Sequence, residues 1–315
     1  MPRYKNVSCP ILKAEGNKSG KRQDIVEDVA FNLIKQAAIY LPLDIKKALQ
    51  RAYEEETSQI GKTQLEAILD NVFMAEEQQA PICQDTGTII FYVKAGATAK
   101  NLDVVEAMLV AATRRATEEI PLRPNAVNPF TNKNSGDNTG RYVPLVHWEI
   151  VEGNGLEISV LLKGGGSENV STVGMLSPGD GLPGLKRFVI DAVIKAGAQP
   201  CPPTILGVAV GGGADTAMFL AKKALLRPLA EANADSEVAA LEIELLEAVN
   251  MTGVGPMGLG GKTSVLAVNA DFAYRHPASF PVAVAFSCWA CRRASARISG
   301  EGKVEYLSQK VEDSC

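Results

Sequence analysis

Apolar residues recur at helical spacing in the first quarter of the chain. Over residues 24–74 they fall three or four positions apart, which predicts amphipathic helices. The residues that set this spacing in the first helix are Ile25, Val29, Leu33, Ile34 and Ala37. Pro42 ends that helix, because proline lacks the backbone N–H that a helix needs. Residues 43–55 and 62–73 follow the same pattern and predict two further helices.

Strands and helices then alternate to the end of the chain. The run T-I-I-F-Y-V at 88–93 is rich in β-branched and aromatic residues, which predicts a strand. Residues 143–151 and 156–162 flank the turn E-G-N-G and predict a hairpin. The other predicted elements are helices at 102–120, 182–196, 214–226 and 235–251, strands at 204–210, 265–269 and 281–286, and a last hairpin of 296–299 with 304–307. This order predicts an α/β fold (α+β mixed), with an N-terminal helical region followed by a mixed sheet with flanking helices.

The chain contains no clear linker, so we expect one domain. Residues 1–22 are polar and irregular and predict an N-terminal arm, while residues 23–315 form the predicted domain. Two long irregular stretches interrupt the pattern at 122–142 and 163–171. Loops of such length inside a compact domain are usually functional or disordered.

Charge and composition exclude several classes of protein. A formal net charge of −4 gives no electrostatic case for binding nucleic acid or an anionic membrane. We find neither an N-terminal signal peptide nor an apolar run long enough to span a membrane. The 6 cysteines in 315 residues are too few for a secreted disulfide scaffold, so we expect reduced thiols and a cytoplasmic protein.

Two glycine-rich runs invite a nucleotide-binding interpretation. The run G-P-M-G-L-G-G-K-T at 255–263 resembles a phosphate-binding P-loop, but Pro256 stands where that motif needs its first glycine. The run G-V-A-V-G-G-G-A-D at 207–215 lacks the dinucleotide-binding pattern, although its backbone amides could hold a carboxylate. The sequence therefore does not support nucleotide binding.

Cysteines mark the edges of three predicted strands. Cys83 lies in P-I-C-Q-D-T-G, Cys201 in P-C-P-P-T and Cys288 in F-S-C-W-A-C. The C-x-x-C of Cys288 and Cys291 lacks the second pair that a structural zinc site requires. One hypothesis is that three scattered thiolates hold an iron–sulfur cluster with one iron left open. The alternative is three unrelated core cysteines.

Several motifs occur together in one order along the chain. They are C-Q-D-T-G at 83–87, N-K-N-S-G-D-N-T-G at 132–140, K-G-G-G-S-E-N at 163–169, C-P-P at 201–203, R-H-P at 275–277 and C-W-A at 288–290. With these motifs, residues 25–308 resemble the N-terminal (α) half of the class I, iron–sulfur-dependent fumarate hydratases and of the related L-tartrate dehydratases.

The resemblance implies a [4Fe–4S] cluster bound by Cys83, Cys201 and Cys288. It further implies substrate contacts by Gln84, Arg123 and Gly166 and catalytic roles for Asp85 and His276. These residue types suit the chemistry of a dicarboxylate, because a guanidinium binds a carboxylate through two N–H groups and a carboxylate accepts a proton. Cys291 departs from the family pattern and leaves open whether Cys288 or Cys291 is the third ligand.

The resemblance also implies a partner chain and a reaction. The family's β half, which supplies further substrate-binding cations and the proposed catalytic base, is absent here, so we expect a separate β subunit. The expected function is the α subunit of a hydro-lyase that hydrates fumarate to (S)-malate. L-Tartrate dehydration is the alternative, and a non-catalytic protein that binds a cluster or a dicarboxylate is the alternative of another class.

Overall fold

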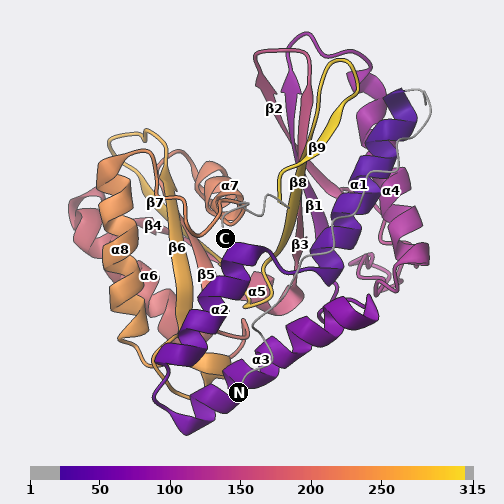
Figure 1. Ribbon diagram of the computed structural model, residues 1–315. Coiled ribbons are helices and arrows are strands. Elements are labelled where there is room, and N and C mark those ends of the chain that lie inside the picture. The colour runs from indigo at the N-terminus through magenta and orange to yellow at the C-terminus, as the bar shows by residue number, and fades with distance from the viewer. Residues whose placement is uncertain (1–21, 309–315) are drawn as a thin grey trace.

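The computed structural model describes residues 22–308 (Figure 1). The predicted arm lies outside the described residues except for Arg22, where the first helix begins, and Cys9 and Cys315 lie outside them too. Within the described range, no helix is both long and apolar enough to cross a membrane. The fold is the predicted mixture of helices and mixed sheets, with helices at the N-terminal end.

The helices agree with the predicted spacing in most places. They are α1 (Arg22–Ile39), α2 (Leu43–Glu55), α3 (Gln59–Gln78), α4 (Val105–Glu119), α5 (Gly165–Asn169), α6 (Gly181–Ala196), α7 (Ala214–Ala224) and α8 (Ser236–Asn250). Pro42 precedes α2, as the sequence predicted. Ser58 begins α3 by accepting a hydrogen bond from the Gly61 N–H at 3.2 Å, which satisfies a donor that the helix leaves free.

The strands form two sheets. They are β1 (Thr88–Gly96), β2 (Leu145–Val151), β3 (Leu156–Lys163), β4 (Thr172–Leu176), β5 (Thr204–Val210), β6 (Val265–Phe272), β7 (Phe280–Ser287), β8 (Arg292–Ile298) and β9 (Val304–Tyr306). The first sheet has the order β2-β1-β3-β8-β9, and the second has the order β4-β7-β5-β6. In the second sheet, β5 runs parallel to β6 and antiparallel to β7.

The hairpin predicted at 143–162 is wrong in its pairing. Strands β2 and β3 do not pair, because β1 lies between them, parallel to β2 and antiparallel to β3. The residues of β1 are buried on both faces, so β1 takes an interior position in the sheet. The E-G-N-G turn instead crosses the end of β1, where the Gly96 N–H donates to the Gly155 carbonyl at 2.9 Å. A Cβ atom at Gly96 would lie 2.4 Å from the Gly153 oxygen, so this crossing requires glycine.

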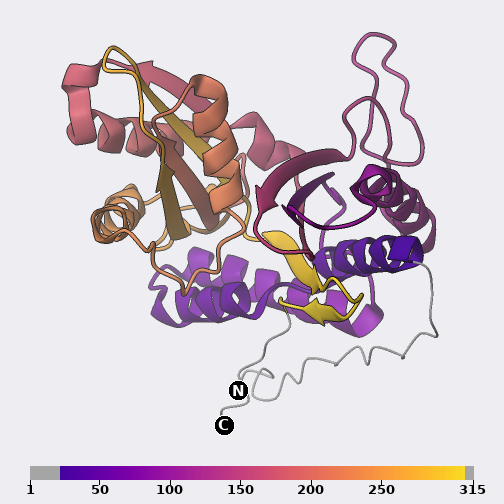
Figure 2. The same cartoon turned by 90° about the horizontal axis from the view of Figure 1, so that it is seen from above.

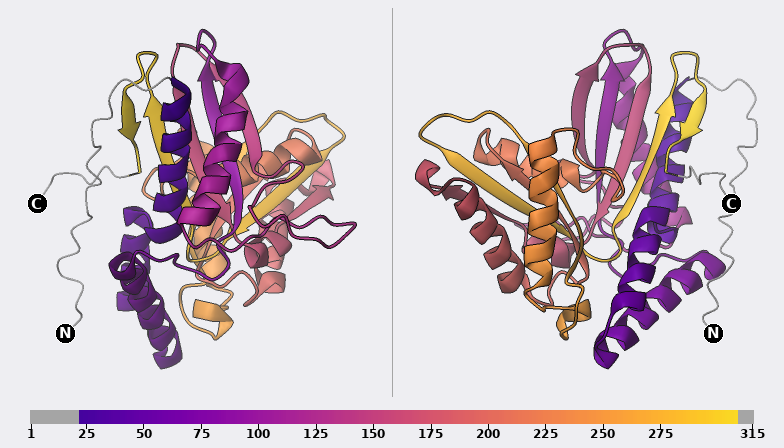
Figure 3. Two further views of the ribbon diagram at one scale, coloured as in Figure 1. Left: turned by 90° about the vertical axis from the view of Figure 1, so that its right-hand side faces the viewer. Right: turned by 60° about the vertical axis from the view of Figure 1, so that its left-hand side comes forward.

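The two sheets are layered with helices between and outside them. Helices α1 and α4 pack on the outer face of the first sheet, and α6 and α8 pack on the outer face of the second (Figures 1 and 2). One hydrophobic cluster contains residues of both sheets together with α2, α3 and α7. Helix α7 therefore lies between the sheets, where Figure 1 labels it, and the right-hand panel of Figure 3 shows the same arrangement from another side. This layering brings strand ends from the two sheets close to each other.

Candidate functional site

The loops at one end of both sheets carry the cysteines that the sequence singled out. Cys83 precedes β1, Cys201 precedes β5 and Cys288 follows β7. Each is a free, half-buried thiol. The Trp289 N–H donates to the Cys201 carbonyl at 3.2 Å and so joins two of these loops directly. Cys201 itself has φ 54°, a left-handed conformation that non-glycine residues adopt rarely and mostly at special sites.

The three thiols lie close enough for their charges to interact. Burial raises the pKa of Cys201, and the charges of Cys83 and Asp85 raise it further. Burial also raises the pKa of Cys288 to about 11, the Arg292 guanidinium opposes that rise, and Cys83 again adds to it. Cys83 thus interacts with both other cysteines, and the fold brings together all three predicted ligands.

Cys291 has different surroundings from Cys288. It is fully buried and belongs to the hydrophobic cluster between the sheets. Its Sγ lies 3.9 Å from the Leu225 carbonyl oxygen, to which it donates a weak hydrogen bond. Burial raises the pKa of Cys291, and Arg293 opposes the rise. Cys288 packs against the same cluster but is only half-buried, and the charge of Cys291 adds to the rise in its pKa. The two cysteines of the C-x-x-C therefore differ in burial.

Asp85 joins the cysteine loop to the glycine-rich loop after β3. One carboxylate oxygen accepts from the Gly87 N–H at 3.0 Å, and the other accepts from the Gly165 N–H at 2.7 Å. The neighbouring Gly166 is exposed, and a Cβ atom there would lie 3.0 Å from the Gln199 carbonyl oxygen in the loop that leads to Cys201. Gln84 is exposed beside these loops. The predicted residues Gln84, Asp85 and Gly166 therefore adjoin the cysteines.

Arg123 has a fixed backbone and a free side chain. Its N–H donates to the Thr86 Oγ1 at 3.0 Å, and its carbonyl accepts from the same hydroxyl and from the Asn138 amide. Arg123 is exposed, and within residues 22–308 its guanidinium makes no hydrogen bond or ion pair. Because Thr86 is adjacent to Asp85, the backbone of Arg123 lies beside the Cys83 loop while its guanidinium is left free.

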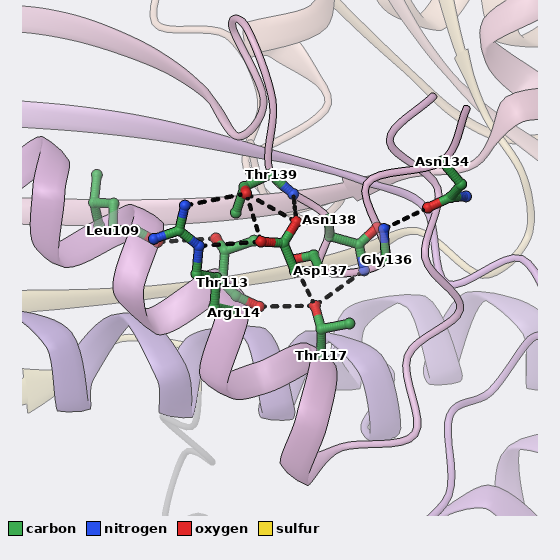
Figure 4. A network of polar contacts seen from close by, with 9 residues as sticks. All are labelled: Leu109, Thr113, Arg114, Thr117, Asn134, Gly136, Asp137, Asn138 and Thr139. Atoms are coloured by element: carbon green, nitrogen blue, oxygen red, sulfur yellow. Dashed lines mark hydrogen bonds and ion pairs between the residues drawn. The ribbon is translucent and has the colours of Figure 1, made fainter. Parts of the chain in front are cut away.

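The long loop that begins with Arg123 is held by a polar network (Figure 4). The Arg114 Nε donates to the Asp137 carboxylate at 3.1 Å, and the Thr139 N–H donates to it at 2.9 Å. The Asn138 amide donates to the Thr117 hydroxyl at 3.1 Å and is itself buried. These contacts fasten the loop to α4.

His276 is the predicted residue that the fold does not bring to this site. It is exposed in the loop before β7, and its Nδ1 accepts from the Ala278 N–H at 3.1 Å. The 8 residues of β7 separate this loop from Cys288, which corresponds to about 26 Å at the rise of an extended strand. A role for His276 stays a prediction.

The sequence interpretation missed two buried cations beside the cysteines. Lys163, at the end of β3, is 3% exposed; its Nζ donates to the Ser167 hydroxyl at 2.8 Å and lies 3.2 Å from the Glu168 carboxylate. Arg292, at the start of β8, is 2% exposed and donates from Nη1 to the Asp85 carbonyl. Lys163 lies inside the K-G-G-G-S-E-N motif, and Arg292 directly follows C-W-A-C. This closeness in sequence to the site motifs could have identified both residues as candidates.

The donor set fits an iron–sulfur cluster better than a single ion. Among the described residues, no three His, Cys, Asp or Glu side chains converge closely enough to hold one metal ion. A cluster takes each thiolate on a different iron, so its ligands stand further apart than the ligands of one ion. Three half-buried thiols on three separate loops, beside two buried cations, have the chemistry of such a donor set.

The P-loop-like run at 255–263 is occupied from within the protein. The Glu56 carboxylate accepts from the N–H groups of Thr57, Ser58 and Lys262, each at 2.9 Å. Burial raises the pKa of Glu56, but these backbone donors outweigh it and hold the pKa below its ordinary value. A side chain of the protein thus takes the Lys262 amide of this run.

Comparison with known proteins identifies one family and several related proteins. Residues 27–297 match the family described as Fumarate hydratase (Fumerase). A protein of Methanocaldococcus jannaschii, named "Putative L(+)-tartrate dehydratase subunit alpha", is 46% identical over 286 residues, covering 89% of this chain and 99% of that protein. L(+)-Tartrate dehydratase subunit alpha of Escherichia coli strain UTI89 is 37% identical over 298 residues, covering 94% and 98% of the two chains.

Proposed function

Because the chain belongs to the fumarate hydratase (Fumerase) family, we propose that it is the α subunit of an iron–sulfur-dependent hydro-lyase that hydrates fumarate to (S)-malate. The observation that carries this proposal is the placement of Cys83, Cys201 and Cys288 on loops at one end of both sheets, where a hydrogen bond joins the loops of Cys201 and Cys288 and the charge of Cys83 acts on both of these cysteines. We propose that these thiolates bind a [4Fe–4S] cluster, and that Cys288 rather than Cys291 is the third ligand. The full burial of Cys291 in the core supports that choice.

The cluster, when bound, supplies an iron without a cysteine ligand, which acts as a Lewis acid toward the hydroxyl and carboxylate of the substrate. The residues of this chain hold the rest of the substrate. The free guanidinium of Arg123 binds a carboxylate through two N–H groups, and the backbone of Gly166 allows close approach. Gln84 offers an amide, and Asp85, held by two backbone donors, positions or accepts a proton.

A partner β subunit completes this proposal. The relatives are named as α subunits, and Arg123 is the free guanidinium that the described residues place beside the cysteine loops. A dicarboxylate needs a cation for each end, so we expect the β subunit to supply the remaining cations and the catalytic base. A cytoplasmic location, where thiols stay reduced, belongs to the same proposal.

L-Tartrate dehydration to oxaloacetate is the second candidate. The names of the relatives favour it, while the family description favours fumarate. Tartrate carries one hydroxyl more than malate, and the contacts described above serve both substrates.

The test is an anaerobic assay of the reconstituted chain, purified together with its proposed β subunit, on fumarate, (S)-malate and L-tartrate. We expect turnover of fumarate by the complex and very little by the α chain alone. If the complex turns over L-tartrate but not fumarate or (S)-malate, L-tartrate dehydration becomes the proposed function. A complex with full cluster content and no turnover of any of the three would favour a non-catalytic binding protein.

A further inference from the structure

Arg292 is a buried cation without an anion. Its side chain is 2% exposed, at the point where β8 leaves the Cys288 loop. Nη1 donates to the Asp85 carbonyl, but Nε is buried and finds no acceptor. Within residues 22–308 no carboxylate forms an ion pair with Arg292. An unpaired buried charge costs several kcal/mol, so an anion is expected to be its partner.

The neighbouring buried cations have partners of their own. Arg293, the next residue of the strand, pairs with the Asp44 carboxylate. Lys163 pairs with Glu168 and donates to Ser167. The charges of Arg292 and Lys163 both interact with Cys288, but Lys163 is paired with Glu168, so Arg292 is the one of these two cations that lacks an anion.

We propose that Arg292 is a positioning residue for the cysteine-bound cluster, balancing its negative charge and offering the Nε–H to one of its sulfurs. This inference rests on the proposed function, because it needs the cluster to be present. In the same arrangement Nη1 holds the carbonyl of Asp85, so one guanidinium connects the Cys288 side of the site to the Cys83 loop. Outer groups of this kind orient the ligands of a metal centre and tune its affinity.

The charge of Arg292 has a predictable effect on oxidation. A [4Fe–4S]²⁺ core with three thiolates carries one net negative charge, and removal of one electron makes it neutral. A buried cation stabilises the negative state, so Arg292 is expected to slow this step. In the test, the electron passes to ferricyanide, and the [4Fe–4S]³⁺ core then releases Fe²⁺ to leave [3Fe–4S]⁺.

The experiment compares Arg292→Gln, Arg292→Lys and the matched control Arg293→Gln in the reconstituted chain. The growth of the three-iron electron paramagnetic resonance signal is followed after addition of a fixed amount of ferricyanide. We expect Arg292→Gln to form the signal about 10- to 100-fold faster, in line with other outer-shell groups. Arg292→Lys keeps the charge and should be intermediate, while Arg293→Gln should match the wild type.

A second readout protects the test against a variant that fails to fold. Proton–electron double resonance of the wild-type three-iron form should show an exchangeable proton coupling that disappears in Arg292→Met, because methionine has no N–H group. Equal oxidation rates in folded, cluster-loaded variants, or a coupling that persists unchanged in Arg292→Met, would overturn the inference. If the wild type binds no cluster, the proposed function fails before this comparison begins.

Discussion

Two cysteine–arginine pairs share the short stretch C-W-A-C-R-R and have different environments. Cys288 and Arg292 lie where the loops of both sheets meet, beside Cys83 and Asp85. Cys291 and Arg293 lie in the core between the sheets, near Leu225 and Asp44. Neighbouring residues of a strand point to opposite faces, so Arg292 and Arg293 separate at the start of β8. The surroundings of each arginine therefore depend on the face of β8 to which its side chain points. Substitutions in one cysteine–arginine pair serve as controls for the same substitutions in the other pair.

The largest expected effect is on cluster binding by the two cysteines. Cys288→Ser should remove the cluster and the hydro-lyase activity, because serine offers no thiolate to the third iron. Cys291→Ser should keep both and lower stability by about 1 kcal/mol, as a polar atom replaces a buried sulfur. Iron and sulfide content, with melting temperature, measures the difference. Cluster loss in Cys291→Ser alone would reverse the ligand assignment.

The next largest effect is expected at Asp85, which lies with Cys288 and Arg292 where the loops of the two sheets meet. Asp85→Asn retains one carbonyl acceptor for the two backbone N–H groups but removes the group that takes a proton. We expect turnover to fall by about 100-fold or more, with iron content unchanged. Steady-state kinetics of the α–β complex measures the loss. Wild-type turnover would show that Asp85 serves only to join the two loops.

On the core side, Arg293→Met should reduce stability rather than cluster binding. The substitution leaves the Asp44 carboxylate without its ion pair in a mostly buried position. The expected loss is about 3 kcal/mol in the free energy of unfolding, measured by urea denaturation of the chain. The free energy of unfolding of Arg292→Met, measured in the same way, allows the effect at Arg293 to be compared with the effect at Arg292. A Met variant at 293 as stable as the wild type would contradict the structural role.

The smallest effect is expected at Asp137, which lies in the Arg123 loop away from both pairs. Burial raises its pKa, but the hydrogen bonds from Thr139, Ser135 and Arg114 outweigh this and lower the pKa from 3.8 to about 2. A lowered pKa stabilises the fold above the unfolded value and loses that contribution as the pH falls toward 2. Asp137→Asn should therefore cost less than about 1 kcal/mol at pH 6, because the pair is exposed.

The pH dependence provides the control for Asp137. The difference in unfolding free energy between wild type and Asp137→Asn should shrink between pH 4 and pH 2, the interval between the two pKa values. A difference that stays constant over this interval would show that the carboxylate charge contributes nothing.

The fold was predictable where the pattern is local. Helix α2 begins and ends where the apolar spacing and Pro42 place it. The insertion of β1 between β2 and β3 was not predictable, because β1 comes much earlier in the chain. The first half of β8 was missed because Arg292 and Arg293 do not have the character of a buried strand, and only the tertiary structure supplies their partners.

The sequence could predict which residue types take part in the candidate site, but not where the fold places them. Motifs identified Cys83, Cys201 and Cys288, and the fold brings them together. His276 was placed with them by resemblance alone, although β7 separates it from Cys288. Lys163 and Arg292 were missed because a charged residue is ordinarily exposed, and their burial depends on contacts between distant loops.

The most direct test of the central claim is the electron paramagnetic resonance spectrum of the anaerobically reconstituted chain before and after mild oxidation. A cluster held by three cysteines should be silent at first, give a three-iron signal on oxidation, and become silent again when ferrous iron is added. A folded chain that takes up no iron and sulfide, and gives no such signal, would contradict the assignment of Cys83, Cys201 and Cys288 as ligands.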